Sequence, residues 1–511
     1  MLSTAYTCAL NGIDGLSVTV ECNISAGLPR FDIIGLPDNA VREAKERIKV
    51  AMTNLGFEFP DEAVVINLAP ADMKKEGSAY DLAMLVAVMC ACGALPRVDL
   101  SQSCFIGELS LSGEVRRIFG TLCMCIAARD AGKKEIFVPA QNAREASAVT
   151  DIDVYGIDSV RDFIGHLTKK KALEPVRFDS ASIKAAEYTS LPDFSDVYGQ
   201  NYAKYAMEIA AAGGHNILLI GPPGTGKSML AQRLPSILPP MSFDEVIETA
   251  KIYSITGLID TEKPLMSQRP FRAPHHTAST VSLSGGGKIP SPGEISLAHN
   301  GVLFLDELPE FARPVCETLR QPLENGNITI TRASGRLTFP SSFILVCAMN
   351  PCKCGYAGHK TRACTCKPDE IRKYMAKISG PLLDRIDLHV EMSTITYDEM
   401  SSHDKPEPSS AVRERVENVR RIQRERFDGK TFHVNAHMTN DQIKEHCKLN
   451  RESSDLMRDA YEKLNFSARV HNKVLKIART IADLEGGGDI TASQLAQALR
   501  FRALDRNSRL S

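Results

Sequence analysis

A phosphate-binding loop at residues 221–228 constrains the fold of this chain more than any other feature. The loop reads Gly-Pro-Pro-Gly-Thr-Gly-Lys-Ser and matches the pattern Gly-x-x-x-x-Gly-Lys-(Ser or Thr) at every fixed position. The apolar run 216–220 before it is typical of a strand, and the run 229–234 after it favours a helix. A strand, this loop and a helix in that order predict a parallel α/β sheet with the loop at the carboxyl end of one strand.

The chemistry of the loop predicts its ligand. Glycines let backbone N–H groups converge on phosphate oxygens, and the N-terminus of the following helix adds a favourable field. Lys227 would reach the β- and γ-phosphates of ATP, and Ser228 would hold Mg²⁺. The alternative is a glycine-rich turn without a ligand. We expect ATP to be bound by the whole loop, that is by Gly221, Pro222, Pro223, Gly224, Thr225, Gly226, Lys227 and Ser228.

Two further apolar runs end in polar residues that suit ATP hydrolysis. Residues 301–305 are followed by Asp306 and Glu307, and residues 343–349 are followed by Asn350. Asp306 would hold Mg²⁺ at the carboxyl edge of the sheet, and Glu307 would polarise the attacking water. Asn350 could orient that water or the γ-phosphate. The alternatives are an ordinary acidic strand end and a simple strand cap.

These segments together resemble an AAA+ ATPase, within the branch shared by magnesium chelatase ATPase subunits and MCM-type helicases. In that branch the segment Leu-Leu-x-Arg-(Phe or Ile)-Asp carries an arginine finger, which the match here places at Arg385. The resemblance also implies that Arg469 is a second arginine that reads the γ-phosphate. Because a finger from a neighbouring subunit neutralises the transferring phosphoryl group, the resemblance implies a ring, most simply a hexamer. The alternatives are an ion pair of Arg385 with Asp384 or Asp387, and a solvated position for Arg469.

The whole chain is similar to the bacterial ComM/YifB family of magnesium chelatase-like proteins. The stretches that carry this similarity are 34–38, 67–72, 270–276 and 378–389. It implies an α/β multidomain fold with a Lon-protease-like (S5-like) α/β domain, an AAA+ phosphate-loop core with a parallel sheet and β-hairpin insertions, and a helical C-terminal lid. We expect these three domains at 1–165, 196–393 and 394–511, with a linker at 166–195.

The N-terminal domain is expected to be proteolytically inactive. Lon-type proteases use a serine activated by a lysine. Ser78 stands where Lon-like domains carry the serine, but the register places Leu122 at the lysine position. We therefore interpret Ser78 as a helix cap. Arg116, Arg117 and Lys133 are left as groups that could approach Ser78 in three dimensions.

Composition limits where the protein works. The 61 basic and 62 acidic residues nearly balance, so any surface for nucleic acid must be local. The sequence contains no run of about 18 apolar residues, so it predicts no membrane span. Residues 1–10 lack the pattern of a secretory signal. Fourteen cysteines without such a signal indicate a reducing compartment. We expect a cytoplasmic protein with no membrane partner.

Four cysteines have the spacing of a metal site. The pattern Cys-x-Cys, nine residues, Cys-x-Cys is formed by Cys352, Cys354, Cys364 and Cys366. Four thiolates suit tetrahedral Zn²⁺, so the sequence predicts a zinc site that would stiffen the strand ending at Asn350. The alternatives are an iron–sulfur cluster and four free thiols, although clustered exposed thiols are open to oxidation.

Basic residues on one predicted hairpin are the candidate DNA contacts. Alternating β-branched and polar residues at 328–340 predict a β-hairpin. In the resembling helicases a hairpin at this position faces the ring pore, where Arg332 and Arg336 would contact phosphates. Lys288, in a glycine-rich insertion, is a further candidate. A structural hairpin with solvated arginines is the alternative, and the arginine-rich segment 411–427 is interpreted mainly as a solvated helix face.

The resemblance implies a hexameric ATP-dependent motor on single-stranded or branched DNA. Such a motor would be a helicase that promotes branch migration of recombination intermediates, as in natural transformation. The alternative is a chelatase-type motor that remodels a protein partner without moving along DNA. A ring that only scaffolds other factors is a third possibility, and an intact hydrolysis site argues against it.

Overall fold

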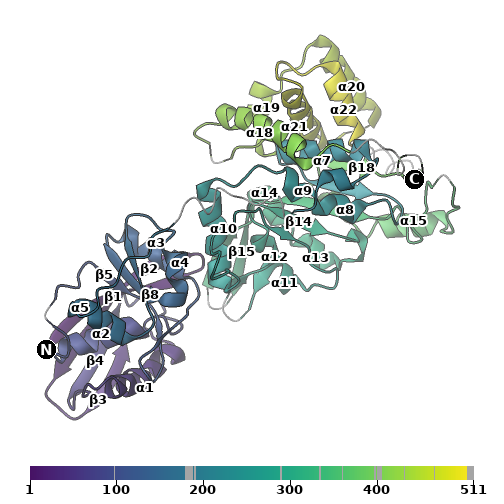
Figure 1. Cartoon of the computed structure of the whole chain (residues 1–511). Coiled ribbons are helices and arrows are strands. Elements are labelled where there is room, and N and C mark those ends of the chain that lie inside the picture. The colour runs from purple at the N-terminus through teal and green to yellow at the C-terminus, as the bar shows by residue number, and fades with distance from the viewer. Residues whose placement is uncertain are drawn as a thin grey trace. The chain divides into compact units, whose positions relative to one another are not determined.

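The structure is a computed structural model. The chain folds into two compact units (Figure 1). It describes residues 1–502 except 97, 179–187, 189–190, 288–289, 333–334, 360, 396, 398, 400–405, 431 and 465. Unit 1 comprises Met1–Ala185 together with Phe243–Met266. Unit 2 comprises Ala186–Ser242 together with Ser267–Ser511.

Unit 1 is built on a mixed four-stranded sheet. Its spatial order is β1-β2-β4-β3, with β3 and β4 parallel and the other pairs antiparallel. Val18, Val20 and Cys22 are buried at alternate positions of β2, because one face of the sheet covers the core. The elements of this layer are β1 (Leu2–Asn11), β2 (Asp14–Ser25), β3 (Arg30–Ile34), α1 (Asn39–Asn54), β4 (Ala63–Ala69) and α2 (Asp81–Ala91).

A second, parallel sheet completes the N-terminal part of unit 1. Its three strands lie in the order β5-β8-β9. The rings of Phe105, Phe137 and Phe163 pack together with centroids 5.0–5.3 Å apart. The elements are β5 (Ser103–Phe105), β6 (Glu108–Leu109), β7 (Val115–Arg116), α3 (Thr121–Asp130), β8 (Glu135–Pro139), η1 (Ala140–Asn142), α4 (Ala143–Ala146), β9 (Asp153–Ile157) and α5 (Val160–Leu167).

Helix α10 (Phe243–Thr256) joins unit 1 although it follows the phosphate-loop helix in sequence. The N–H of Gly120 donates to the carbonyl of Ser254 (3.0 Å), and the Ser254 hydroxyl donates to Glu145, which is itself buried. Lys251 Nζ lies 3.7 Å from a carboxylate oxygen of Asp14. Within the range 196–393 expected to form the AAA+ core, residues 243–266 therefore pack on the N-terminal unit. A sequence pattern shows that a helix has an apolar face but not which surface covers it.

Unit 2 is built on a five-stranded parallel sheet with the order β11-β14-β17-β10-β18. The central strands are apolar along their whole length because helices cover both faces of a parallel sheet. Strand β10 pairs with β17 on one side and with β18 on the other. The strands are β10 (Ile217–Ile220), β11 (Phe271–Arg272), β14 (Val302–Leu305), β17 (Ile344–Met349) and β18 (Leu388–Glu391). The parallel phosphate-loop sheet expected from the sequence is confirmed.

Helices and short ladders surround this sheet. The predicted hairpin is present as β15 and β16, which pair from Asn327↔Pro340 to Arg332↔Gly335. The helical elements are η3 (Phe194–Asp196), α7 (Asn201–Gly213), α8 (Lys227–Gln232), α9 (Leu234–Ile237), α11 (Thr280–Ser284), α12 (Glu294–Leu297), η4 (Leu308–Glu310), α13 (Arg313–Glu317), α14 (Arg320–Asn325), α15 (Pro368–Met375) and α16 (Gly380–Leu383). The remaining strands are β12 (Gly285–Gly286), β13 (Ser291–Pro292), β15 (Asn327–Arg332) and β16 (Gly335–Pro340).

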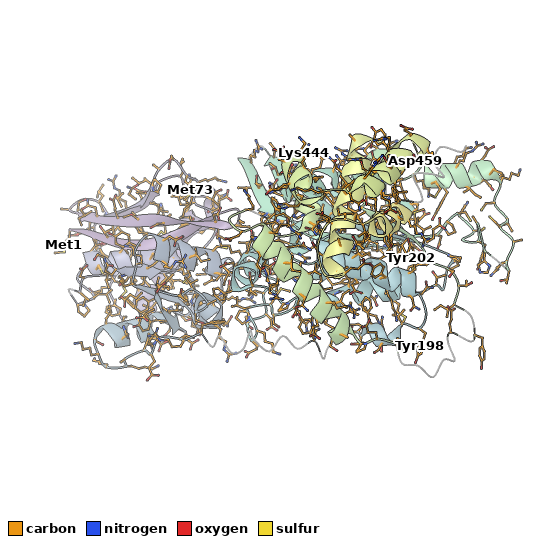
Figure 2. All side chains as sticks on the ribbon, turned by 90° about the horizontal axis from the view of Figure 1, so that it is seen from above. Met1, Met73, Tyr198, Tyr202, Lys444 and Asp459 are labelled. Carbon is orange, nitrogen blue, oxygen red and sulfur yellow. The ribbon has the colours of Figure 1, made fainter. Side chains whose placement is uncertain are left out.

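The C-terminal helices share one hydrophobic core with the sheet. Tyr202 of α7, labelled in Figure 2, stacks on Phe501 with ring centroids 5.1 Å apart. Lys473 Nζ lies 2.5 Å from a carboxylate oxygen of Asp387, and both side chains are buried. Burial lowers the pKa of Lys473 to about 8 although Asp387 opposes the shift. The helices are α18 (Ser409–Arg426), η5 (Asn435–His437), α19 (Asn440–His446), α20 (Arg451–Leu464), α21 (Ala468–Leu484) and α22 (Ala492–Arg500).

The arginines of α18 are used inside the subunit more than the sequence suggests. Arg415 pairs with Glu208 and Glu407, and Arg420 donates to the carbonyl of Ala211. Arg426 binds Asp483 through both terminal nitrogens. Arg413 donates to a backbone carbonyl as well. The interpretation of this helix as mainly a solvated face is therefore wrong for four of its six arginines.

Candidate functional site

The phosphate loop connects β10 to α8, as the sequence predicts. Gly224 and Gly226 have positive φ angles of 80° and 85°, so the loop turns through backbone conformations that favour glycine. Lys227 Nζ donates to the carbonyls of Gly221 (2.7 Å) and Pro222 (2.9 Å). Burial lowers the pKa of Lys227, an effect that Asp306 partly opposes. The ammonium group lies inside the loop, where a phosphate would replace backbone oxygens as its partner.

The acidic strand end meets the loop directly. Ser228 Oγ donates to Asp306 Oδ2 over 2.6 Å. A serine hydroxyl and a carboxylate this close form the oxygen-ligand pair that Mg²⁺ takes beside nucleotide phosphates. Glu307 follows with a φ of 52°, and its side chain is 59% exposed. This left-handed backbone turns the Glu307 carboxylate away from the strand axis and leaves it open to solvent.

Asn350 completes the cluster from the end of β17. Its side-chain oxygen accepts a hydrogen bond from Lys227 Nζ over 3.1 Å. Asp306 and Asn350 follow the strands β14 and β17, and Lys227 and Ser228 begin the helix that follows β10, the neighbour of β17 in the sheet. Hydrogen bonds join Lys227 to Asn350 and Ser228 to Asp306, and Glu307 follows Asp306 in the sequence.

Arg385 and Arg469 converge on a different carboxylate. The guanidinium groups of both arginines bind Glu324 Oε1. Arg385 donates to it through a hydrogen bond, and Arg469 donates to it over 3.3 Å. Arg385 Nη1 also donates to the carbonyl of Pro381 over 2.6 Å. The alternative ion pair with Asp384 or Asp387 is not formed, since the observed partner is Glu324. Among the described residues, the hydrogen-bond partners of the Arg385 side chain are Pro381 and Glu324, neither of which belongs to the phosphate loop.

The four cysteines form a compact cluster. The sulfur atoms of Cys352, Cys354, Cys364 and Cys366 all lie within 4.8 Å of one another. Three of their separations are 3.4, 3.5 and 3.7 Å, close to the roughly 3.8 Å between sulfurs placed tetrahedrally about 2.3 Å from zinc. The donor set and its geometry both fit a tetrahedral metal site.

Backbone N–H groups donate to cysteine sulfurs in this cluster, which favours the thiolate form. N–H groups of Tyr356 and Thr365 donate to Cys354 and lower the pKa of its thiol to about 5. An N–H from Cys366 acts in the same sense on Cys364, but burial and the nearby thiols of Cys354 and Cys352 raise the pKa of Cys364 to about 12. Negative charge on one sulfur disfavours ionisation of the next, and a bound dication would remove that penalty.

The cysteine loop touches the phosphate loop. A Cβ added to Gly355 would lie 2.7 Å from Pro223 Cδ and 3.9 Å from Asn350 Cγ. Gly355 also has a positive φ of 87°. The segment that carries the cysteines therefore packs against both the phosphate loop and the residue that ends β17.

The candidate DNA residues are only partly described. Arg332 and Arg336 are exposed on opposite strands of the β15–β16 hairpin. Arg332 Nη1 donates to the backbone carbonyl of Thr331 over 3.0 Å. Lys288 and residues 333–334 lie outside the described residues. The hairpin itself is confirmed, and its role in DNA binding stays a prediction.

In the N-terminal unit Ser78 is not a helix cap, which corrects the sequence interpretation. Helix α2 begins after Tyr80 with no side-chain cap, and the Ser78 hydroxyl instead donates to Glu108. Leu122 is fully buried in α3. Lys133 donates to the carbonyl of Ser101, whereas the partner of the Ser78 hydroxyl is Glu108. The absence of protease activity stays a prediction, and Ser78 has a carboxylate as its partner.

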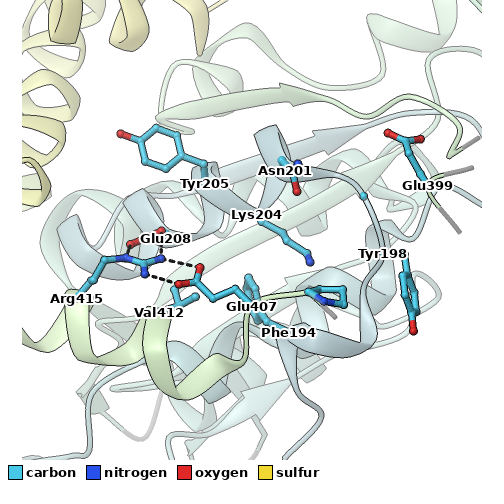
Figure 3. A pocket seen from close by; sticks show the side chains of 12 residues that line it. Phe194, Tyr198, Asn201, Lys204, Tyr205, Glu208, Glu399, Glu407, Val412 and Arg415 are labelled. Carbon is cyan, nitrogen blue, oxygen red and sulfur yellow. Dashed lines mark hydrogen bonds and ion pairs between the residues drawn. The ribbon is translucent and has the colours of Figure 1, made fainter. Parts of the chain in front are cut away.

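A cavity of about 560 Å³ lies between α7 and α18, and its lining explains why it is not the reaction site (Figure 3). Arg415 spans Glu208 and Glu407, and Lys204 Nζ donates to the carbonyl of Val197. The dashed lines in Figure 3 mark the pairing of Arg415 with both glutamates. None of Lys227, Asp306 and Asn350 lines this cavity.

Two residues near the site, Gln200 and Glu324, were missed by sequence reasoning, whereas His276 lies in the segment 270–276 that the sequence had singled out. Gln200 Nε2 donates to the carbonyls of Thr225 (3.3 Å) and Ser393 (2.6 Å) and so ties the phosphate loop to the end of β18. Glu324 collects the two arginines, and His276 Nδ1 lies 3.6 Å from Glu307 Oε2. The sequence signal for Gln200 is only a Gly-Gln pair before a helix, and Glu324 has no motif.

Family models match nearly the whole chain. The model for magnesium chelatase, subunit ChlI, matches residues 193–400, and the model for subunit ChlI of Mg-chelatase matches residues 20–142. The model for the ChlI C-terminal region matches residues 406–502. The competence protein ComM of Haemophilus influenzae is 43% identical over 511 residues, which cover 99% of this chain and 98% of that protein.

The chain belongs to the ComM/YifB family. Another member, YifB of Salmonella typhimurium, is 41% identical over 99% of this chain and 98% of its own length. The magnesium-chelatase subunit ChlI of Euglena gracilis is 23% identical over 40% of this chain and 58% of that protein. Family membership places the chain among magnesium chelatase-like AAA ATPases, which hydrolyse ATP. Among the described residues of this family member, no helix is long and apolar enough to cross a membrane.

The contact between the cysteine loop and the phosphate loop can be tested with a matched pair of glycines. Gly355→Ala would press on Pro223, whereas Gly358 has a similar φ of 77° with nothing within 4 Å of its added Cβ. We expect Gly355→Ala to raise the Kd for ATP about tenfold, which corresponds to a loop displacement costing about 1.4 kcal/mol. Gly358→Ala carries the same backbone strain without the contact and should leave the Kd within about twofold. Equal Kd values in an equilibrium titration of a fluorescent ATP analogue would contradict the inferred contact.

Proposed function

We propose that this chain is an ATP-dependent DNA motor that works as a hexameric ring and promotes branch migration of recombination intermediates. The observation that carries the proposal is the split of the nucleotide-reading groups. Lys227, Ser228, Asp306, Glu307 and Asn350 cluster at one sheet edge, whereas Arg385 contacts Glu324 and Pro381. A guanidinium that contacts Glu324 and Pro381 rather than residues of the phosphate loop of its own subunit is suited to serve the site of a neighbour.

Each residue of the cluster has a defined part in hydrolysis. Lys227 would neutralise the β- and γ-phosphates, and the Ser228–Asp306 pair would hold Mg²⁺, which spreads the charge of the leaving phosphate. Glu307, open to solvent, would accept a proton from the attacking water, with Asn350 orienting it. Arg385 from the next subunit would stabilise the charge that develops on the transferring group. Arg469 would close the helical part on the nucleotide.

The DNA part of the proposal has two supports. Arg332 and Arg336 are exposed on the two strands of one hairpin, and two exposed arginines so placed suit a phosphate backbone. The relative from Haemophilus influenzae is a competence protein, and competence is the context of natural transformation. The second candidate function, remodelling of a protein partner, is favoured by the ChlI models that match most of the chain.

The role of Glu307 is tested by Glu307→Gln. The amide cannot accept the proton of water, so kcat for ATP hydrolysis should fall by about 100-fold or more. Binding of ATP should persist, because the phosphates are held by Lys227 and the loop. Glu310→Gln, a nearby exposed carboxylate paired with Lys377, is the control and should keep the wild-type rate. Turnover by Glu307→Gln at the wild-type rate would remove this residue from the mechanism.

DNA binding is tested by replacing Arg332 and Arg336 together with Ala. Two lost phosphate contacts on a single strand should reduce the slope of log K against log salt by about 1.4, that is about 0.7 for each contact. The rate of ATP hydrolysis with single-stranded DNA should fall toward the rate without it. Arg451→Ala with Arg458→Ala, which removes two exposed arginines of α20, controls for net charge. A wild-type ATPase that ignores DNA at low salt would favour the protein-remodelling motor.

We propose that the four-cysteine cluster binds one structural Zn²⁺. Metal analysis of the purified protein should give about one zinc per chain, since closed four-thiolate sites hold zinc firmly. Cys354→Ser with Cys364→Ser should lose that zinc. Cys92→Ser removes an exposed cysteine outside the cluster and should keep it. Less than about half an equivalent in the wild type would contradict the site, and iron in place of zinc would reassign the metal.

A further inference from the structure

Glu324 links the two arginines to the hairpin through described contacts. It is next to the last residue of α14 and stands three positions before β15. Its Oε1 accepts from Nη2 of both Arg385 and Arg469. The Arg385 side chain is only 12% exposed in this position, whereas Glu324 and Arg469 are 43% and 52% exposed. One accessible carboxylate thus pairs with two guanidinium groups at once, and the three groups together keep one positive charge.

The backbones that carry the two arginines are fixed to each other independently of Glu324. Asp387 lies two residues after Arg385, and Lys473 lies one helical turn after Arg469. The buried Asp387–Lys473 ion pair joins the segments, with 2.5 Å between Nζ and Oδ1. The Asp387 carboxylate also accepts from the N–H of Asn216 over 3.0 Å. Removal of the Glu324 charge would therefore free the arginine side chains while their backbones stay in place.

The base of the hairpin is tied to the helix that ends at Glu324. Gln321 of α14 donates to Thr329 Oγ1 of β15 over 3.3 Å. The N–H of Ser341 donates to the carbonyl of Gly326 over 2.8 Å, which closes the base of the hairpin just after α14. These bonds and two intervening residues connect Glu324 to β15.

We propose that Glu324 is a positioning residue that holds Arg385 and Arg469 until phosphate competes for them, and that their departure shifts the hairpin. The inference rests on the proposed function, because it takes both arginines as readers of the γ-phosphate. The same two cations can bind either the carboxylate or a phosphate, and phosphate carries more charge and more acceptor oxygens. DNA held by Arg332 and Arg336 would act on the same carboxylate from the hairpin side.

Glu324→Gln tests this role through the direction of the change in the KM for ATP. Loss of a merely structural contact would not lower the KM. The neutral amide competes poorly for guanidinium groups, so the KM for ATP should fall by about threefold or more when the arginines are free. Stimulation by single-stranded DNA should shrink, because the state that DNA favours is already populated. In the double variant Glu324→Gln with Arg385→Ala, the KM should lie no lower than that of Arg385→Ala alone, because the gain depends on this arginine.

The controls separate this inference from the proposed function. Glu417→Gln removes a carboxylate of similar exposure (45%) that lies 4.0 Å from Arg413, and it should leave both KM and the DNA response as in the wild type. An unchanged KM, or a raised KM with a lower kcat, in Glu324→Gln would overturn the positioning role. A wild type that ignores DNA would overturn the DNA motor alone, since the change in KM is measured without DNA.

Discussion

The nucleotide site depends on the parallel pairing of β10 with β17 and of β17 with β14. The register places Ile220 beside Met349 and Leu305 beside Cys347, so the three strands end within a few residues of the same level. The backbone N–H of Gly221 donates to the carbonyl of Met349 and fixes the first residue of the phosphate loop to the neighbouring strand. Because side chains at the ends of parallel strands share one edge, Lys227, Asp306 and Asn350 meet although more than a hundred residues separate the first from the last.

Much of this arrangement could be predicted from the sequence, because it follows from local patterns. Apolar runs that end in Gly-rich or acidic residues predict buried strands and identify the side chains at their ends, and the positions of Lys227 and Asp306 required no more. The partners of Arg385 and the docking of α10 could not be predicted. Both depend on segments that approach only after the chain has folded, and neither Glu324 nor the apolar face of α10 carries a motif. Ser78 shows the converse, since a familiar local pattern suggested a cap and tertiary contact with Glu108 overrode it.

Unit 2 contains two ion-pair contacts that differ in burial, one between Asp387 and Lys473 and one between Glu324 and two arginines. The Asp387–Lys473 pair is buried, and breaking such a pair leaves an uncompensated charge in the core, so it holds the helical part firmly against β18. The contact of Glu324 with Arg385 and Arg469 is nearer the surface, where an ion pair is worth little and is easily exchanged. A rigid frame that carries exchangeable arginines is the combination that a nucleotide-driven machine requires.

The docking of α10 has a consequence for how the chain can be divided. The chain passes between the two units three times, at residues 185–186, 242–243 and 266–267. Val246, Ile252 and Tyr253 of α10 are covered by the N-terminal unit, which is encoded mostly before the phosphate loop. A fragment that begins at residue 186 would retain this helix and lose the rest of unit 1, which would expose the apolar side chains of α10 to solvent. Unit 2 therefore cannot be separated from unit 1 by truncating the chain at a single position. A chimaera that exchanges unit 1 must exchange α10 with it.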